Sequence, residues 1–122
     1  SAPAGTVSVV SKVDLVGRFA DGGQAHVDGV NVTIGPNARF DADGHYVGGE
    51  LRFSQSGTGL MLLDGTFEAR RGGTIEGKAP AGDLTARRSF RVAPGGCIGL
   101  SAGLMVNTVS ASADTPISPS CP

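Results

Sequence analysis

Few side chains in this sequence have the types and spacing that metal binding needs. The stretch Asp41 to Gly44 has alternating carboxylates, like the opening of a calcium loop. No further carboxylate follows until Glu50, so we interpret the stretch as an Asp-Gly turn. The two histidines, His26 and His45, belong to no compact set of zinc ligands. We therefore predict no metal site and no cofactor.

The sequence gives equally little support for a catalytic nucleophile. Cys97 follows two glycines and would need a nearby base to act as a nucleophile. Ser56 and Ser101 lack the spacing of a nucleophile elbow. Paired carboxylates could hydrolyse a glycoside. The candidates, Glu50, Glu68 and Glu76, are instead interpreted as outward-facing strand residues. The sequence thus predicts no catalytic residues, and we expect a protein that is not an enzyme.

The two cysteines fit a disulfide bond better than free thiols. Cys121 is the penultimate residue of a tail, residues 112–122, that is rich in Ser and Pro. Such a tail frays unless a bond pins it, and a Cys97–Cys121 bridge would stabilise the fold by roughly 3–4 kcal/mol. We therefore expect an oxidising compartment, with the protein secreted, extracellular or periplasmic. The start of the chain at Ser1, without methionine, suits a mature chain whose signal peptide has been removed.

Arginines are the remaining polar candidates. A cluster on adjacent strands could hold a carboxylate, sulfate or phosphate group, and its members would be Arg70, Arg71, Arg87 and Arg91. The alternative is a solvated face that Glu68 and Glu76 balance. Arg88 shares the parity of buried neighbours, so it points inward unless a bulge shifts it.

The elements that must position these residues read as short strands joined by glycine turns. Apolar and polar residues alternate with period two, and Asp-Gly pairs at residues 28–29, 43–44 and 64–65 favour two-residue hairpins. Residues 24–34 would form one hairpin, and Phe40 would pair with Val47 in the next. The turn at residues 64–65 would place Leu60, Leu62, Phe67 and Ala69 inside, and Met61 and Leu63 outside. A loop at residues 71–73 would set Glu68 opposite Glu76.

These hairpins predict an all-β fold of about nine or ten short strands, either an antiparallel β-sandwich or a small closed β-barrel. The 122 residues suit a single domain, residues 1–122, with an extended lead at residues 1–5 and a disulfide-pinned tail at residues 112–122. We find no repeat of fixed length, which argues against a solenoid. A net charge of −1 argues against nucleic acid as a partner, and no apolar run is long enough to span a bilayer.

Three features favour a surface that meets another protein. Met61 and Leu63 form an apolar patch on the outer face, Val10 and Val16 do the same on the first strand, and the last strand, from Cys97 toward Val109, has a smooth face of Gly and Ser. The first strand could add to a neighbour's sheet edge through Val7, Val9, Val13 and Leu15. We thus expect a secreted, non-enzymatic structural or interaction module. It would be a subunit of a cell-surface, filamentous or adhesive assembly, with itself or another protein as its partner.

The alternative belongs to a different class. A small β-barrel could bind a ligand, or a protease-type inhibitor could block another protein, through exposed Gly-rich loops. Those loops would be residues 56–59 and residues 95–97. A chain that stays monomeric would favour this alternative.

Overall fold

The computed structural model describes residues 2–9, 12–14, 23–43 and 48–121. Every regular element in these ranges is a strand, and every paired strand is parallel to its neighbour. The strands are β1 (Ala2–Val9), β2 (Lys12–Asp14), β3 (Gln24–Ile34), β4 (Arg39–Asp41), β5 (Glu50–Gln55), β6 (Leu60–Leu63), β7 (Thr66–Glu68), β8 (Thr74–Ala79), β9 (Asp83–Arg91), β10 (Cys97–Ala102), β11 (Val106–Ala113) and β12 (Ile117–Ser118).

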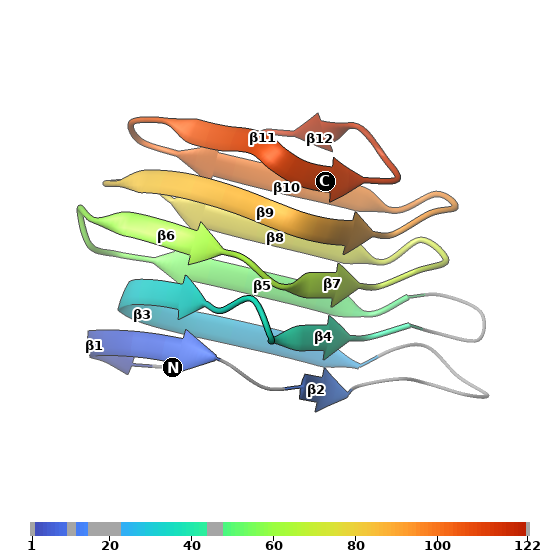
Figure 1. The fold of residues 1–122 in the computed structure, drawn as a ribbon, viewed down its shortest axis with the longest axis horizontal. Coiled ribbons are helices and arrows are strands. Elements are labelled where there is room, and N and C mark those ends of the chain that lie inside the picture. The colour runs from blue at the N-terminus through green and yellow to red at the C-terminus, as the bar shows by residue number, and fades with distance from the viewer. Residues whose placement is uncertain (1, 10–11, 15–22, 44–47, 122) are drawn as a thin grey trace.

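The chain coils into a parallel β-solenoid of about four turns. Figure 1 shows the coils stacked from β1 and β2 at one end to β11 and β12 at the other. The expectation of strands without helices is confirmed for the described residues. The prediction of an antiparallel sandwich or closed barrel was wrong. Strands that follow one another in the chain do not pair with each other; each pairs with strands of the coils on either side.

Three ladders of parallel strands form the faces of the solenoid. The first face stacks residues 24–29 of β3 with β5, β8, β10 and β12. The second face stacks residues 6–9 of β1, residues 31–34 of β3, β6, residues 83–86 of β9 and the start of β11, while Ala2 of β1 pairs with Gly29 at the end of the first face. The third face stacks β2, β4, β7, residues 89–91 of β9 and the end of β11. β3, β9 and β11 therefore bend from one face into the next.

A column of phenylalanines on the third face fixes the register of the coils. Phe40 pairs with Phe67, and Phe67 pairs with Phe90. Their rings stack with centroids 5.6 Å and 4.7 Å apart, and Phe53 meets Phe40 and Phe67 edge-on at 5.1 Å and 5.3 Å. All four rings are at most 1% exposed. Aromatic contacts of this kind add to the free energy gained from apolar burial.

This column also corrects the prediction that the chain holds no repeat. Phe67 lies 27 residues after Phe40 and Phe90 lies 23 residues after Phe67. The repeat exists, but its length varies, because corners of different length join the strands. A search for one fixed period therefore misses it.

The Asp-Gly pairs are corners and not hairpin turns. Asp28 and Gly29 lie within the continuous strand β3, where it passes from the first face toward the second. Asp64 and Gly65 separate β6 from β7, which pair with other coils and not with each other. The third such pair is only partly described, because Gly44 and Val47 lie outside the described residues. Phe40, which we expected to pair with Val47, pairs with Val13 and Phe67.

The corner at residues 64–65 reverses the predicted faces of β6. Met61 and Leu63 are fully buried, whereas Leu60 is 50% exposed and Leu62 is half-buried. A hairpin would have flipped the alternation between β6 and β7. A corner preserves it, so Met61 and Leu63 point inward together with Phe67, and the predicted outer patch does not form.

Two further corners use the left-handed backbone region. Arg88 has φ of 67° at the bend within β9, and its exposed side chain donates from Nε to Asp64 Oδ1 at 3.0 Å. The left-handed bend at Arg88, and not an inward arginine, thus accounts for its parity. Arg71 and Gly72 have φ of 70° and 86° at the corner between β7 and β8. Glu68 consequently pairs with Asp41 and Arg91, and not with Glu76 as predicted.

The C-terminal tail folds back on the first face. Cys97 and Cys121 form a disulfide bond with Cα atoms 5.8 Å apart, as predicted. The tail crosses Gly99, where an added Cβ would lie 3.0 Å from the backbone nitrogen of Cys121. The smooth surface expected on the last strand is therefore covered by the chain's own tail. That last strand is in fact two strands, β10 and β11, separated by a corner. In the described part of the chain, no helix could cross a membrane.

Candidate interaction surface

The C-terminal end of the solenoid exposes one whole strand edge. β11 pairs with β9 on one side, and no other strand of the described residues pairs with its second edge. The Met105 carbonyl accepts the Leu84 N–H at 2.9 Å, and the Asp114 N–H donates to the Phe90 carbonyl at 3.3 Å. Because successive peptide groups in a strand point to opposite sides, the groups that face the open edge belong to Val106, Ala111 and Ala113.

Apolar side chains surround this edge. Large hydrophobic residues are exposed at the two corners of the last coil: Leu104 at 73%, Met105 at 66%, Val106 at 38% and Val109 at 91%. Only Asp114 is charged among residues 92–122. Natural proteins usually protect an exposed strand edge with lysine, proline or a covering segment, and β11 has none of these among the described residues. We call this edge and its four apolar residues the C-terminal edge.

Polar side chains fix the inner side of β11 and leave the outer side open. The Asp114 carboxylate accepts the N–H groups of Val92 at 3.0 Å and Ala93 at 3.1 Å. Arg91 donates to the Ser112 carbonyl and hydroxyl, each at 3.1 Å. These bonds tie β11 to β9, so the outward peptide groups are held in extended conformation before any partner arrives, which lowers the entropic cost of association.

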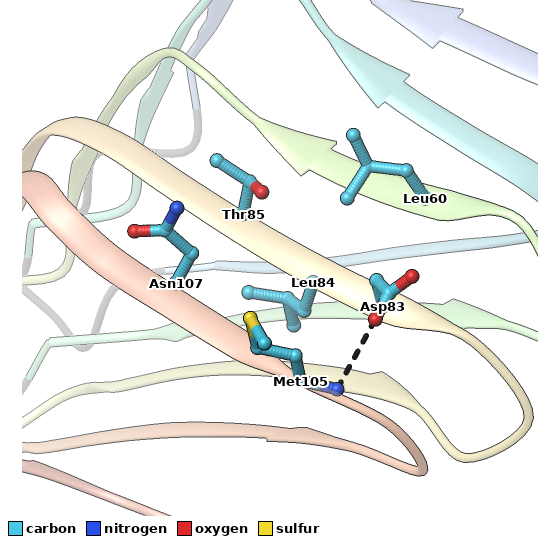
Figure 2. Close-up of a pocket in the computed structure, with 6 residues that line it drawn as sticks. All are labelled: Leu60, Asp83, Leu84, Thr85, Met105 and Asn107. Atoms are coloured by element: carbon cyan, nitrogen blue, oxygen red, sulfur yellow. Dashed lines mark hydrogen bonds between the residues drawn. The ribbon is translucent and has the colours of Figure 1, made fainter.

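A shallow pocket of about 350 Å³ adjoins the C-terminal edge on the second face. Figure 2 shows Leu60, Thr85 and Asn107 along one side of it and Met105 beside Leu84. Asp83 Oδ1 accepts the Met105 N–H at 3.2 Å, which holds the corner before β11 in place. The pocket therefore combines two exposed apolar side chains with hydroxyl and amide groups, and it continues the surface of the C-terminal edge.

The first face, by contrast, carries a ladder of paired charges. Arg52 bonds Glu50 at 3.3 Å and also bonds Glu76, which in turn forms an ion pair with Lys78 at 3.6 Å. The hydrogen bond from Arg52 lowers the pKa of Glu50. The second oxygen of Glu76 accepts the Cys121 N–H at 3.3 Å, so this ladder also holds the tail.

Two of the arginines predicted to form an anion site are paired within the chain. Arg70 donates from Nη2 and Nε to Asp43 Oδ2, at 2.6 Å and 3.0 Å, and also contacts Glu68 at 3.3 Å. Arg91 is bonded to Ser112. Arg87 lies at the bend within β9, and Arg71 at the corner after β7. At least two of the four guanidinium groups, those of Arg70 and Arg91, are therefore engaged within the chain.

The residues predicted for strand exchange lie at the opposite end of the solenoid. Val7 and Val9 belong to β1 and Val13 belongs to β2, the first strands of the second and third faces. Leu15, like Val10 and Val16, lies outside the described residues. Sequence reasoning missed Leu104, Met105 and Val109. The available signal was the near absence of charge after Arg91, which a solvated β-strand rarely shows.

The histidines, the possible metal ligands and the Gly-rich loop at residues 56–59 give less support for a functional site. His26 is half exposed and lies 3.9 Å from Glu50, while His45 is outside the described residues. Among the described residues, no group of three or more His, Cys, Asp or Glu side chains could hold a metal ion. The loop at residues 56–59 packs onto its neighbours, because the buried Gln55 side chain donates to the Gly59 carbonyl at 2.8 Å and accepts the Val32 N–H at 2.9 Å.

Comparisons with known proteins leave the fold and this surface as the basis for a functional argument. No family model, no curated protein and no solved structure matches the chain.

Proposed function

We propose that this protein is a secreted, non-enzymatic structural module that associates through its C-terminal edge, as a subunit of a cell-surface or filamentous assembly. The observation that carries the proposal is the open edge of β11, which is uncharged and flanked by exposed Leu104, Met105 and Val109. Association through such an edge forms main-chain hydrogen bonds and removes apolar surface from water at the same time.

The construction of the solenoid supports an assembly role. Repeat proteins usually need terminal coils with a polar outer face to remain soluble and separate. The last described coil has the opposite character, because its outer edge presents backbone groups and apolar side chains. The disulfide bond that closes the tail is compatible with an extracellular location.

A proline substitution on the open edge tests the proposal. Ala111→Pro removes an N–H that points away from β9, so the solenoid keeps its internal pairing but loses a donor for a partner strand. Analytical ultracentrifugation over a concentration series should show the wild-type chain increasing in weight-average mass. Ala111→Pro should remain at monomer mass, and Ala111→Ser, the matched control, should assemble like the wild type.

A second variant covers the case in which proline disturbs the fold. Val109→Lys places a charge on a side chain that is 91% exposed, and its control, Thr58→Lys, places the same charge on an exposed corner far along the chain. Circular dichroism reports whether each variant keeps its strands. A wild-type chain that is monomeric throughout, or Val109→Lys assembling like Thr58→Lys, would contradict the proposal.

The second candidate function is ligand binding in a monomeric protein, and the pocket beside Thr85 and Asn107 favours it. Its volume lies near the lower end of the range for small-molecule sites. It would be preferred if the wild-type chain stayed monomeric at all concentrations, which is the result that excludes the first proposal.

A further inference from the structure

The pocket on the second face contains a carboxylate that the chain does not neutralise. Glu50 on the first face and Glu68 on the third each bond an arginine, whereas Asp83 has no ion-pair partner among the described residues. Its Oδ1 accepts the Met105 N–H at 3.2 Å. Figure 2 shows the second oxygen of Asp83 turned away from Met105, and no described donor bonds that oxygen. The pocket therefore keeps one negative charge for a ligand.

Two exposed apolar side chains flank this carboxylate. Leu60 is the register partner of Asp83 on β6, and Met105 lies on the opposite side of Asp83, at the corner before β11 (Figure 2). The two side chains are 50% and 66% exposed. A ligand bound to Asp83 would thus meet apolar surface on both sides of its charged group, which favours a charge that is carried on a hydrocarbon chain.

Two neutral polar side chains supply further hydrogen-bond acceptors. Thr85 lies two residues after Asp83 on β9, so both side chains point to the same side of the strand. Asn107 is the register partner of Thr85 on β11, and both line the pocket. Their hydroxyl and amide oxygens add two acceptors to the free oxygen of Asp83. A primary ammonium group has three N–H donors and no acceptor, so its donors match this set in number and kind.

The charges on the neighbouring strands also favour a cation. β6 and β11, which pair with β9 on either side, contain no charged residue. The next charged residue along β9 is Arg87, four positions from Asp83, which corresponds to about 13 Å along a strand. Salt at physiological strength screens charges beyond about 8 Å. Arg87 therefore opposes a cation at Asp83 only weakly.

We infer that this pocket binds a primary ammonium group on an alkyl chain. The ammonium group bonds the oxygens of Asp83, Thr85 and Asn107, and its methylene groups pack against Leu60 and Met105. A free alkylamine and the lysine side chain of another protein share this chemistry. The inference rests on the second candidate function, ligand binding in this pocket, and adds the class of ligand. It does not need assembly through the C-terminal edge, so the two ideas can fail separately.

Saturation-transfer NMR tests the ligand class, because it observes the ligand and works for monomers and assemblies alike. 1-Aminopentane, which is protonated at pH 7, should bind saturably to the wild type. 1-Pentanol, of the same length but without charge, should bind at least about tenfold more weakly. Asp83→Asn keeps an oxygen for the Met105 N–H and should weaken binding of the amine by a similar factor. Its control, Asp28→Asn, removes a carboxylate that bonds Ser54 on the first face and should bind like the wild type.

A capped lysine, Nα-acetyl-lysine methylamide, distinguishes the two sources of the ammonium group. Binding as tight as that of 1-aminopentane indicates a lysine side chain, and binding of 1-aminopentane alone indicates a free amine. The inference is wrong if neither amine binds saturably, if 1-pentanol binds as tightly as the amine, or if a folded Asp83→Asn binds like the wild type. Should Asp83→Asn lose its strands by circular dichroism, the comparison with 1-pentanol still decides, because it uses the wild type alone.

Discussion

At the scale of single residues, Gln55 shows how a corner of the solenoid is held. Its side chain is 1% exposed and satisfies the buried Val32 N–H of the coil below together with the Gly59 carbonyl of its own corner. A buried donor without an acceptor costs about 1–3 kcal/mol, which is more than the bond itself contributes. Gln55 therefore stabilises the fold mainly because, without it, the buried Val32 N–H would have no acceptor.

We predict that Gln55→Leu destabilises the protein by about 1–3 kcal/mol, because leucine fills the space but leaves the Val32 N–H without a partner. The free energy of unfolding in urea measures the loss. Gln24→Leu makes the same chemical change on an exposed side chain and should change stability by less than about 0.5 kcal/mol. Equal losses in the two variants would show that the buried bonds of Gln55 contribute nothing.

A second residue-scale prediction concerns acid. Burial opposes the ionisation of Asp43, but the hydrogen bonds from the Arg70 side chain and N–H outweigh it and lower the pKa of Asp43. A lowered pKa in the folded state gives stability that is present above the unfolded value of about 3.9 and is lost as the pH falls through the folded pKa. We expect Arg70→Gln to remove part of the stability near neutral pH and almost none in strong acid.

The loss in Arg70→Gln should be under about 1 kcal/mol, because the Arg70 side chain is 53% exposed and solvent screens the pair. Thermal unfolding from pH 7 to pH 2 checks it, with Arg87→Gln as the control for a removed surface charge. A difference between wild type and Arg70→Gln that stays constant with pH would contradict the assignment to Asp43.

At the scale of elements, the phenylalanine column couples one coil to the next. Phe67 touches Phe40 below, Phe90 above and Phe53 across the core. We predict that Phe67→Ala costs about 3–5 kcal/mol, through lost apolar burial and the cavity it leaves. Leu60→Ala, at a half-exposed position on the neighbouring strand, should cost much less. Urea unfolding of both variants makes the comparison, and a small loss for Phe67→Ala would mean that the coils are not held together by this column.

The strands themselves could be read from the sequence, and their partners could not. Alternation identifies a strand with one buried face, and this holds whether the next strand is antiparallel or lies in another coil. An Asp-Gly pair favours a hairpin turn because glycine allows positive φ, but at the corner after β6 Gly65 is needed because an added Cβ would lie 2.9 Å from the Ala38 carbonyl oxygen. The sequence around Asp64 therefore predicted the bend correctly and its consequence wrongly, and the faces of Met61 and Leu63 were exchanged.

The repeat was present in the sequence in a form that a fixed period cannot detect. A polar residue, an apolar residue and a charged residue recur as a triplet at residues 12–14, 39–41, 66–68 and 89–91, and these triplets are the strands of the third face. Aligning the triplets, instead of counting residues, would have indicated stacked coils. The disulfide bond could be predicted without such an alignment, because Cys121 lies in a polar tail that needs a bond to hold it in place.

At the scale of the whole molecule, each coil pairs with the coils above and below it. The last described coil pairs on one side only, so its free side is available to a partner. The last coil has two different boundaries. Its first face is covered by β12 and by the tail that the Cys97–Cys121 bond holds, whereas its second and third faces end in the open edge of β11. β12 pairs with β10 at only two positions, Ile117 and Ser118, so the covalent bond carries most of its attachment.

This division predicts that reduction weakens both the fold and the assembly. Opening a bridge between residues 24 apart should lower the free energy of unfolding by roughly 3 kcal/mol in the chain-entropy model. It should also free β12 and the tail from the first face, so that the last described coil, which carries the C-terminal edge, is less well ordered. Ultracentrifugation in a thiol reductant should then show smaller assemblies at a given concentration. The double variant Cys97→Ser with Cys121→Ser should behave like the reduced protein and should not respond to reductant. Assemblies of unchanged size in a reduced protein that remains folded would mean that β12 takes no part in the contact between copies, and that the contact is confined to β11.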